Sequence, residues 1–226
     1  MCYSFKTSII SFSIGMIAGI VAVCTNQIII GTLILFFVQM QLAEALIWRG
    51  IDTDNKNLNK IGTLYAKYNL PTHLFAIGLG YLISIFYQKE KFLWTDIIPL
   101  LIGIIFYVSI VLLYHRTKSK TMTFPLKITK NKCQNPDNRL LWPFPHYKWY
   151  VVSFILSIIV VFFLRTLKLY SKILFTFFIL TIYFISLFLS RQTIGSFFCF
   201  FSAIGSPIIV FLNYFIVHDN FPNLKK

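Results

Sequence analysis

Long apolar runs separated by short polar segments make up most of the chain. Seven of these runs approach the roughly 20 residues that a helix needs to cross the hydrocarbon core of a bilayer. None has the strict two-residue alternation of a membrane barrel, so helices are expected to satisfy the backbone groups in lipid. The pattern predicts an all-α, polytopic integral membrane protein, a single domain of seven transmembrane helices. The predicted spans cover residues 7–28, 28–49, 69–87, 94–114, 149–165, 170–190 and 193–217.

Polar residues and a proline indicate where the early spans begin and end. The three polar residues Thr25, Asn26 and Gln27 separate the first two spans, and so short a connection predicts an antiparallel helical hairpin. Pro71 suits the first turn of the third span. The preceding residues 61–70 are predicted either to extend that span or to lie on the membrane surface.

Composition and charge support the membrane assignment and predict an orientation. Hydrophobic residues make up 57% of the chain and charged residues only 12%, which excludes an ordinary soluble domain. The formal net charge is +14. With seven spans, the side that holds the N-terminus collects 14 basic residues and the other side 7. The positive-inside rule therefore predicts a cytosolic N-terminus and a C-terminus on the opposite side.

The only long connection, residues 115–148, carries a net charge of +7. A basic segment beside a cytosolic leaflet is expected to bind anionic lipid headgroups. The aromatic residues near the end of this connection and just after it, including Trp142 and Trp149, are typical of the membrane interface. Nucleic-acid binding is the competing interpretation, but no recognised module surrounds these residues, so no nucleic-acid partner is predicted.

Glu44 is the only acidic residue well inside a predicted span. Gln41 and Trp48 share its helix face at spacings i, i+3 and i+7. With the span ending near Arg49, Glu44 would lie about 7 Å below the cytosolic end. One interpretation is a carboxylate that snorkels to the interface or pairs with Arg49 or another basic residue. The other is a pocket residue that binds a cation or accepts a proton.

Several other polar side chains fall at the same predicted depth, because the first, third and seventh spans begin or end there. They allow a polar vestibule among the first, second, third and seventh spans. The candidate pocket residues are Cys2, Ser4, Gln41, Glu44, Trp48, His73, Ser196 and Cys199.

No motif indicates a cofactor or a specific catalytic chemistry. There is no glycine-rich phosphate loop, no zinc-protease motif and no hydrolase elbow, and no cysteine spacing predicts a metal site. The seventh span lacks a lysine for a retinal Schiff base, so a conventional photoreceptor is excluded. A zinc site of His73, His115 and His146, as in seven-span ceramidases and adiponectin receptors, is conceivable but weakly supported. No oligomeric state is predicted.

Three patches carry a resemblance to a known group of proteins. They are Met1-Cys2-Tyr3-Ser4, the Gln41, Glu44 and Trp48 pattern with Phe36-Phe37 before it, and residues 196–203 with the sequence SFFCFFSA. The chain resembles an uncharacterised seven-span membrane family with bacterial, algal, fungal and giant-virus members. The resemblance implies a retained N-terminus and gives weight to Cys2, Glu44 and Cys199, but it implies no activity. The abundance of Ile, Phe, Lys and Asn also suits an AT-rich genome, such as that of a large virus or a protist.

Three functions fit these observations, in decreasing order of preference. The first is a transporter or channel for a small solute, cation or proton, with Glu44 as the essential charge. The second is a structural or scaffolding protein of a cellular or virion membrane, in which Glu44 only fixes helix packing. The third is an intramembrane enzyme that modifies lipid, with Cys2 or Ser4 as nucleophile and His73 or Glu44 as base.

Overall fold

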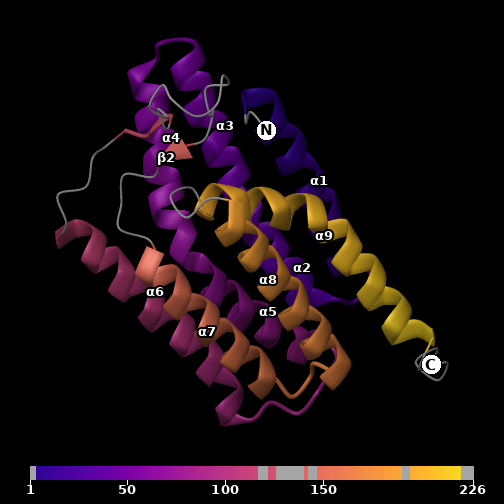
Figure 1. Cartoon of the computed structure of the whole chain (residues 1–226). Coiled ribbons are helices and arrows are strands. Elements are labelled where there is room, and N and C mark those ends of the chain that lie inside the picture. The colour runs from indigo at the N-terminus through magenta and orange to yellow at the C-terminus, as the bar shows by residue number, and fades with distance from the viewer. Residues whose placement is uncertain (1–3, 117–121, 126–139, 142–146, 190–193, 220–226) are drawn as a thin grey trace.

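The computed structural model describes residues 4–116, 122–125, 140–141, 147–189 and 194–219 (Figure 1). The described chain is helical apart from one pair of two-residue strands, which confirms the predicted all-α class. Helices occupy all seven apolar segments. The elements are α1 (Phe5–Cys24), α2 (Ile28–Phe37), α3 (Gln39–Asp52), α4 (Lys56–Asn69), the 3-10 turn η1 (Leu70–Thr72), α5 (His73–Tyr87), η2 (Trp94–Ile97), α6 (Ile98–Arg116), β1 (Phe124–Pro125), β2 (Leu140–Leu141), α7 (Tyr147–Phe163), α8 (Leu169–Leu189) and α9 (Ile194–Asp219).

Four helical stretches are long and apolar enough to cross a membrane. They are Phe5–Cys24, Ile28–Asp52, Lys56–Tyr87 and Trp94–Arg116. Within the described residues, α8 and α9 contribute the shorter apolar stretches Leu169–Ile185 and Ala203–Phe215. Large apolar side chains, such as Ile17 on α1 and Ile105 on α6, remain exposed along the outer faces. Such faces are expected where lipid rather than water covers a helix.

The first two helices form the antiparallel hairpin that the sequence predicts. Asn26 adopts a positive φ of 64° in the connecting turn. Close contact then depends on Gly31, because a Cβ atom there would lie 2.9 Å from the carbonyl oxygen of Gly19 on α1. The hairpin is therefore closed by small residues, which allow two backbones to approach each other.

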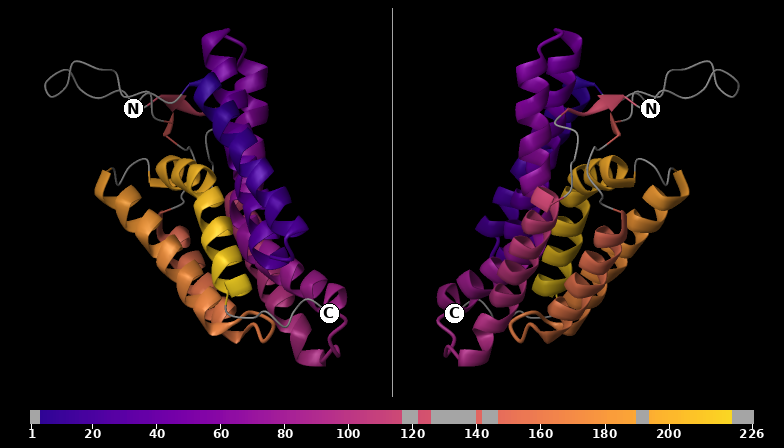
Figure 2. Two further views of the ribbon diagram at one scale, coloured as in Figure 1. Left: turned by 90° about the vertical axis from the view of Figure 1, so that its right-hand side faces the viewer. Right: turned by 90° about the vertical axis from the view of Figure 1, so that its left-hand side faces the viewer.

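The second and third spans are longer than predicted. The helix after Val38 continues to Asp52 rather than ending near Arg49. Residues 61–70 are helical and continue into the third apolar segment: α4, η1 and α5 form one stretch of 32 residues from Lys56 to Tyr87. At 1.5 Å per residue this stretch is about 48 Å long, against about 30 Å for a bilayer core. The α3–α4 hairpin accordingly projects beyond the other helices, at the end of the bundle where α1 begins (Figures 1 and 2).

The centre of the bundle is α2, whose residues Ile28–Ile34 are all buried. It packs against α1, α5 and α9, and α9 lies between α1 and α8 (Figure 2). α7 lies outside this centre and contacts α5 and α8. The segment between α6 and α7 returns to the body of the protein through β1 and β2, which pair antiparallel with Phe124 opposite Leu141.

Candidate functional site

The three polar residues predicted to share one face of the second span do so in α3. Glu44 and Gln41 have no exposed surface, and Trp48 is 4% exposed. Gln41 donates from Nε2 to Oε2 of Glu44 at 3.4 Å, a long hydrogen bond. Because α3 continues to Asp52, Glu44 lies eight residues from the helix end, or about 12 Å. The carboxylate is therefore farther from the end of its helix than the sequence predicted.

α1 presents two serines to the same region. The residue pairs Gly15–Val38, Gly19–Leu35 and Phe5–Arg49 fix the antiparallel alignment of α1 with α2 and α3. In this alignment, Ser8 and Ser11 lie level with the part of α3 that holds Gln41, Glu44 and Trp48. The exposed fractions of Ser8 and Ser11 are 0% and 1%. The residues Ser8, Ser11, Gln41, Glu44 and Trp48 are called the α1–α3 polar cluster below.

Four atoms of the α1–α3 polar cluster make no hydrogen bond among the described residues. They are Oγ of Ser8, Oγ of Ser11, Oε1 of Gln41 and Nε1 of Trp48. Buried polar groups are nearly always hydrogen-bonded, so a group of such atoms indicates a place where water or an ion binds. Neither Ser8 nor Ser11 was among the candidate pocket residues chosen from the sequence. The signal for them was the spacing of small residues along the buried face of α1.

The remaining predicted pocket residues lie elsewhere or outside the described part. Ser4 is the N-cap of α1, and its hydroxyl accepts a hydrogen bond from the backbone N–H of Thr7 at 3.2 Å. Cys2 precedes the described residues, and the side chains of Ser196 and Cys199 on α9 also lie outside them. Arg49, a predicted partner of Glu44, is exposed, and its guanidinium lies over the ring of Phe5, 5.6 Å from the centroid.

His73 belongs to a separate polar contact. Its Nδ1 atom lies 3.0 Å from the carbonyl oxygen of Leu70, and its Nε2 atom is hydrogen-bonded to Oγ of Ser153 on α7. A carbonyl only accepts, so Nδ1 carries the proton, and Nε2 accepts from the Ser153 hydroxyl. The ring stacks on Phe37 of α2, with 5.7 Å between ring centroids. The structure thus joins His73 to α2 and α7 rather than to the α1–α3 polar cluster.

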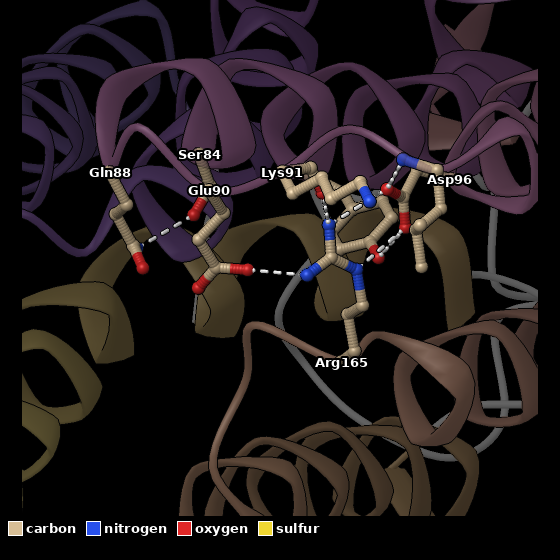
Figure 3. A network of polar contacts seen from close by, with 8 residues as sticks. Ser84, Gln88, Glu90, Lys91, Asp96 and Arg165 are labelled. Carbon is tan, nitrogen blue, oxygen red and sulfur yellow. Dashed lines mark hydrogen bonds and ion pairs between the residues drawn. The ribbon is translucent and has the colours of Figure 1, made fainter.

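The opposite end of the bundle contains an ion-pair network that sequence reasoning missed (Figure 3). Asp96, only 2% exposed, accepts from Nε and Nη2 of Arg165 at 2.9 and 2.8 Å. It also accepts from the Tyr81 hydroxyl at 2.6 Å and from the backbone N–H of Leu93 at 2.8 Å. Arg165 further contacts Glu90 at 2.7 Å. The hydrogen bonds that Arg165 donates to Asp96 raise the pKa of the Arg165 guanidinium.

This network connects segments that are distant in sequence. Tyr81 lies on α5, Glu90 follows α5, Asp96 lies in η2, and Arg165 lies in the connection between α7 and α8. It therefore attaches the α7–α8 pair to the rest of the bundle. The sequence offered one signal for this contact. Asp96 is a single acidic residue at the start of one span, and Arg165 is a single arginine in a short connection.

Beside this network, a cavity of about 470 Å³ lies at the end of the bundle opposite the α1–α3 polar cluster. Its rim includes the exposed residues Asn26, Tyr87 and Gln88, so it opens at the surface. Deeper in, the Asn213 side-chain amide donates to Oε1 of Gln27 at 2.9 Å. Oδ1 of Asn213 is buried and has no hydrogen-bond partner among the described residues. The polar lining also includes Ser84, Glu90, Thr166, Lys168 and Ser171. Burial lowers the pKa of the Lys168 ammonium group.

A small, mostly apolar space of about 30 Å³ lies among α2, α8 and α9. Ile30 lines both spaces. The lining of the small space includes Leu33, Phe37 and Ile209, and it reaches Val38. Gln41 follows Val38 on the next turn of α3. The open cavity, the small space and the α1–α3 polar cluster thus follow one another along α2 and α3, a line called the α2–α9 seam below.

The long basic segment is anchored to α4 by a second interaction that sequence reasoning missed. The side-chain amide of Asn59 donates to the carbonyl oxygen of Thr123 at 2.9 Å and accepts from its N–H at 3.0 Å. The hydroxyls of Thr63 and Thr123 lie 2.8 Å apart. All three residues are at most 3% exposed. This contact holds the start of the segment, next to β1, against the α3–α4 hairpin.

Comparison with known proteins identifies no relative: no family model, curated protein or solved structure matches the chain. The resemblance based on three sequence patches therefore stays a prediction. Among the residues that the structure describes, no three His, Cys, Asp or Glu side chains come together as a transition-metal site. Cys24 is exposed and carries a free thiol.

Proposed function

We propose that the protein is a multi-pass membrane transporter or channel that moves a small solute, cation or proton along the α2–α9 seam. The observation that carries this proposal is the order of features along one pair of helices. A polar cavity open at one end is followed by an apolar constriction and then by a buried carboxylate at the other end. Ionisable groups inside membrane helices are expensive and typically serve such pathways.

The α2–α9 seam is open to the surface at one end and closed at the other, which suits a transporter that works by alternating access. Neither of the two spaces described above includes Glu44 in its lining, while the cavity beside Asn213 reaches the surface. In transporters, one side of the binding region opens as the other closes, and broken helices at mid-depth allow the movement. Here α2 and α3 are separated at Val38, and Pro207 interrupts the hydrogen bonding of α9. Both positions lie at the constriction.

The proposal includes the full topology and the membrane contacts. All seven helical segments cross the bilayer, with the N-terminus and the α3–α4 hairpin in the cytosol. In this orientation, the segment of residues 115–148 lies at the cytosolic leaflet and binds anionic lipid headgroups. The contact of Thr123 with Asn59 supports this arrangement, because it holds that segment beside the exposed Lys56 and Lys60 of α4.

The test is solute- or ion-dependent flux in proteoliposomes that contain the full chain. We expect Glu44→Gln to abolish flux without preventing folding, because it removes the buried charge beyond the constriction of the seam while keeping the side-chain shape. Asp52→Asn is the matched control, since Asp52 is an exposed acid at the end of the same helix. Unchanged flux in Glu44→Gln would contradict the proposal and leave the structural role as the better account.

One observation favours the alternative of an intramembrane lipid-modifying enzyme. Ser153 donates to His73, whose other nitrogen is oriented by the Leu70 carbonyl, and this arrangement suits a serine nucleophile with its base. This serine is not the Ser4 that the sequence suggested. A fluorophosphonate probe tests the alternative directly: labelling that is lost in Ser153→Ala and kept in Ser157→Ala would support it, and no labelling would contradict it.

A further inference from the structure

The cavity beside Asn213 shares part of its lining with a groove on the outer surface. The groove has a volume of about 490 Å³ and lies between α1 and α9, which pack against each other. Its lining is apolar except at one end, where Thr25, Gln27 and Tyr214 also line the cavity. A polar space thus continues into an apolar one. We propose that the two spaces together bind one lipid with a phosphoethanolamine headgroup, which lies in the cavity while an acyl chain follows the groove.

The position of the two spaces matches the depth of a lipid in one leaflet. The cavity lies where the connections of α1 to α2, α5 to η2 and α7 to α8 meet. Connections at the ends of membrane-spanning helices lie at the level of the headgroups. The groove extends from Thr25 back to Ile14, about 16 Å along α1, which is close to half of the roughly 30 Å hydrocarbon core. This step rests on the membrane-crossing arrangement of the proposed function, but not on transport.

The groove faces the surroundings of the bundle. Ile17 and Val21 of α1 and Phe211 of α9 line it, and all three are exposed. On a helix that crosses a bilayer, such side chains contact acyl chains. A groove of this kind accepts any chain, so the choice of lipid depends on the polar cavity at its end.

The hydrogen bonds around Asn213 determine which headgroup atom can bind there. Nε2 of Gln27 donates to the carbonyl oxygen of Val210 at 3.1 Å, and a carbonyl oxygen only accepts. Oε1 of Gln27 is therefore the atom that faces Asn213, and it accepts from Nδ2 at 2.9 Å. Oδ1 of Asn213 is left over, buried and without a hydrogen-bond partner among the described residues. Because a buried acceptor is nearly always satisfied, a ligand in this cavity is expected to donate to it.

The rest of the cavity lining narrows the choice of headgroup. Oγ1 of Thr166 is also buried without a partner among the described residues, and a hydroxyl can donate to a phosphate oxygen. Glu90 and Lys168 give the described lining one negative and one positive charge. A phosphoethanolamine group has ammonium donors, a phosphate acceptor and no net charge, so it matches all of these features. A choline headgroup has no N–H to donate, and a glycerol headgroup leaves the lipid with a net negative charge.

The experiment uses the purified full chain, freed of lipid in detergent. Phosphatidylethanolamine and phosphatidylcholine with identical acyl chains are titrated, and bound lipid is recorded by native mass spectrometry and by the midpoint of thermal unfolding. We expect one lipid to bind saturably and to raise the midpoint, because a ligand that binds only the folded state stabilises it. The ethanolamine lipid should bind about tenfold more tightly, because only its headgroup satisfies the buried acceptor.

Two substitutions test the headgroup site. Asn213→Ala removes the acceptor and should abolish the preference for the ethanolamine lipid. Thr166→Val keeps the shape of the side chain, removes its hydroxyl and should weaken the binding of both lipids. Thr176→Val on α8 is the matched control, because its Oγ1 is likewise buried without a partner among the described residues but does not line the cavity. If Asn213→Ala fails to fold, Thr166→Val decides the question.

A third substitution tests the groove. Val21→Trp fills it and should weaken the binding of both lipids about tenfold while leaving their ratio unchanged, because apolar contact with the chain is lost. Ile20→Trp is the control, at an exposed position of the same helix that does not line the groove. Soluble glycerophosphoethanolamine, which has the headgroup but no chain, should bind far more weakly than the lipid.

Each outcome decides for or against the lipid site. Equal affinity for the two lipids overturns it, and so does unchanged binding in both Thr166→Val and Val21→Trp. Binding of the soluble headgroup as tight as that of the lipid also overturns it and indicates a site for a small solute. A preference for the ethanolamine lipid without flux in proteoliposomes supports the lipid site and contradicts transport. Flux without any lipid preference overturns the lipid site and leaves transport standing.

Discussion

Two carboxylates are buried in the part of the chain that the structure describes, and their surroundings differ. Asp96 receives two hydrogen bonds from Arg165, one from Tyr81 and one from a backbone N–H, at distances of 2.6–2.9 Å. Glu44 is buried as deeply, and the Gln41 side-chain amide donates to it at 3.4 Å. Asp96 joins segments distant in sequence, whereas Gln41 lies one turn from Glu44 on the same helix. The comparison contrasts a carboxylate that ties distant segments together with one that the transport proposal assigns to a pathway.

The largest effect on stability is expected from Asp96→Ala. The substitution leaves the Tyr81 hydroxyl, the Leu93 N–H and Arg165 without their common acceptor. We expect the free energy of unfolding in detergent to fall by about 3 kcal/mol. Glu90→Gln removes only the partly exposed contact to the same arginine and should cost less than about 1 kcal/mol. Equal losses in the two variants would show that Asp96 has no special role.

A smaller loss is expected when the anchor of the long segment is removed. Asn59→Ala deletes both hydrogen bonds to Thr123 and leaves its backbone N–H and carbonyl buried. We expect unfolding to become easier by about 1–2 kcal/mol and trypsin to cut faster between β1 and β2. Asn57→Ala, at an exposed position of the same helix, is the control and should change neither measurement.

Glu44→Gln should change stability by less than about 1 kcal/mol, in either direction, because removing a buried charge offsets the loss of its contacts. Asp96→Asn should in contrast lose most of the stability lost in Asp96→Ala. Both variants are measured by the same thermal or detergent unfolding. If Glu44→Gln loses as much stability as Asp96→Asn, both carboxylates have a structural role, and the scaffolding function is favoured.

The smallest effect is expected from the arginine that the sequence offered to Glu44. Arg49 is exposed over Phe5, so Arg49→Ala should leave unfolding within about 0.5 kcal/mol of the wild type. Its matched partner is Arg165→Ala, which removes the ion pair of Asp96 and should lower the unfolding temperature clearly. A large loss of unfolding free energy in Arg49→Ala would instead support the ion pair of Arg49 with Glu44 that the sequence suggested.

Structural features that involve residues close in sequence were predicted well. The polar turn at residues 25–27 correctly predicted a hairpin, and the helical spacing correctly placed Gln41, Glu44 and Trp48 on one buried face. The end of this helix was placed three residues too early, because Arg49 was taken as the membrane boundary. Its length instead follows from packing against α4, where a Cβ atom on Gly62 would lie 2.9 Å from the carbonyl oxygen of Ala43.

Contacts between distant segments were not predicted. His73 was grouped with Glu44 from its predicted depth, yet its partner is Ser153, 80 residues later in the chain. Asn59 with Thr123 and Asp96 with Arg165 are separated by 64 and 69 residues, and no local pattern links their members.

The sequence by itself determined the helical class and the positions of the apolar segments, because both depend on local composition and on the 3.6-residue period. It also determined that a carboxylate lies among apolar residues of the second segment. Only the tertiary structure decided which helices surround that carboxylate, which polar groups are satisfied and where cavities remain. Those properties depend on how helices pack side by side, and packing brings together side chains whose separation along the chain carries no signal.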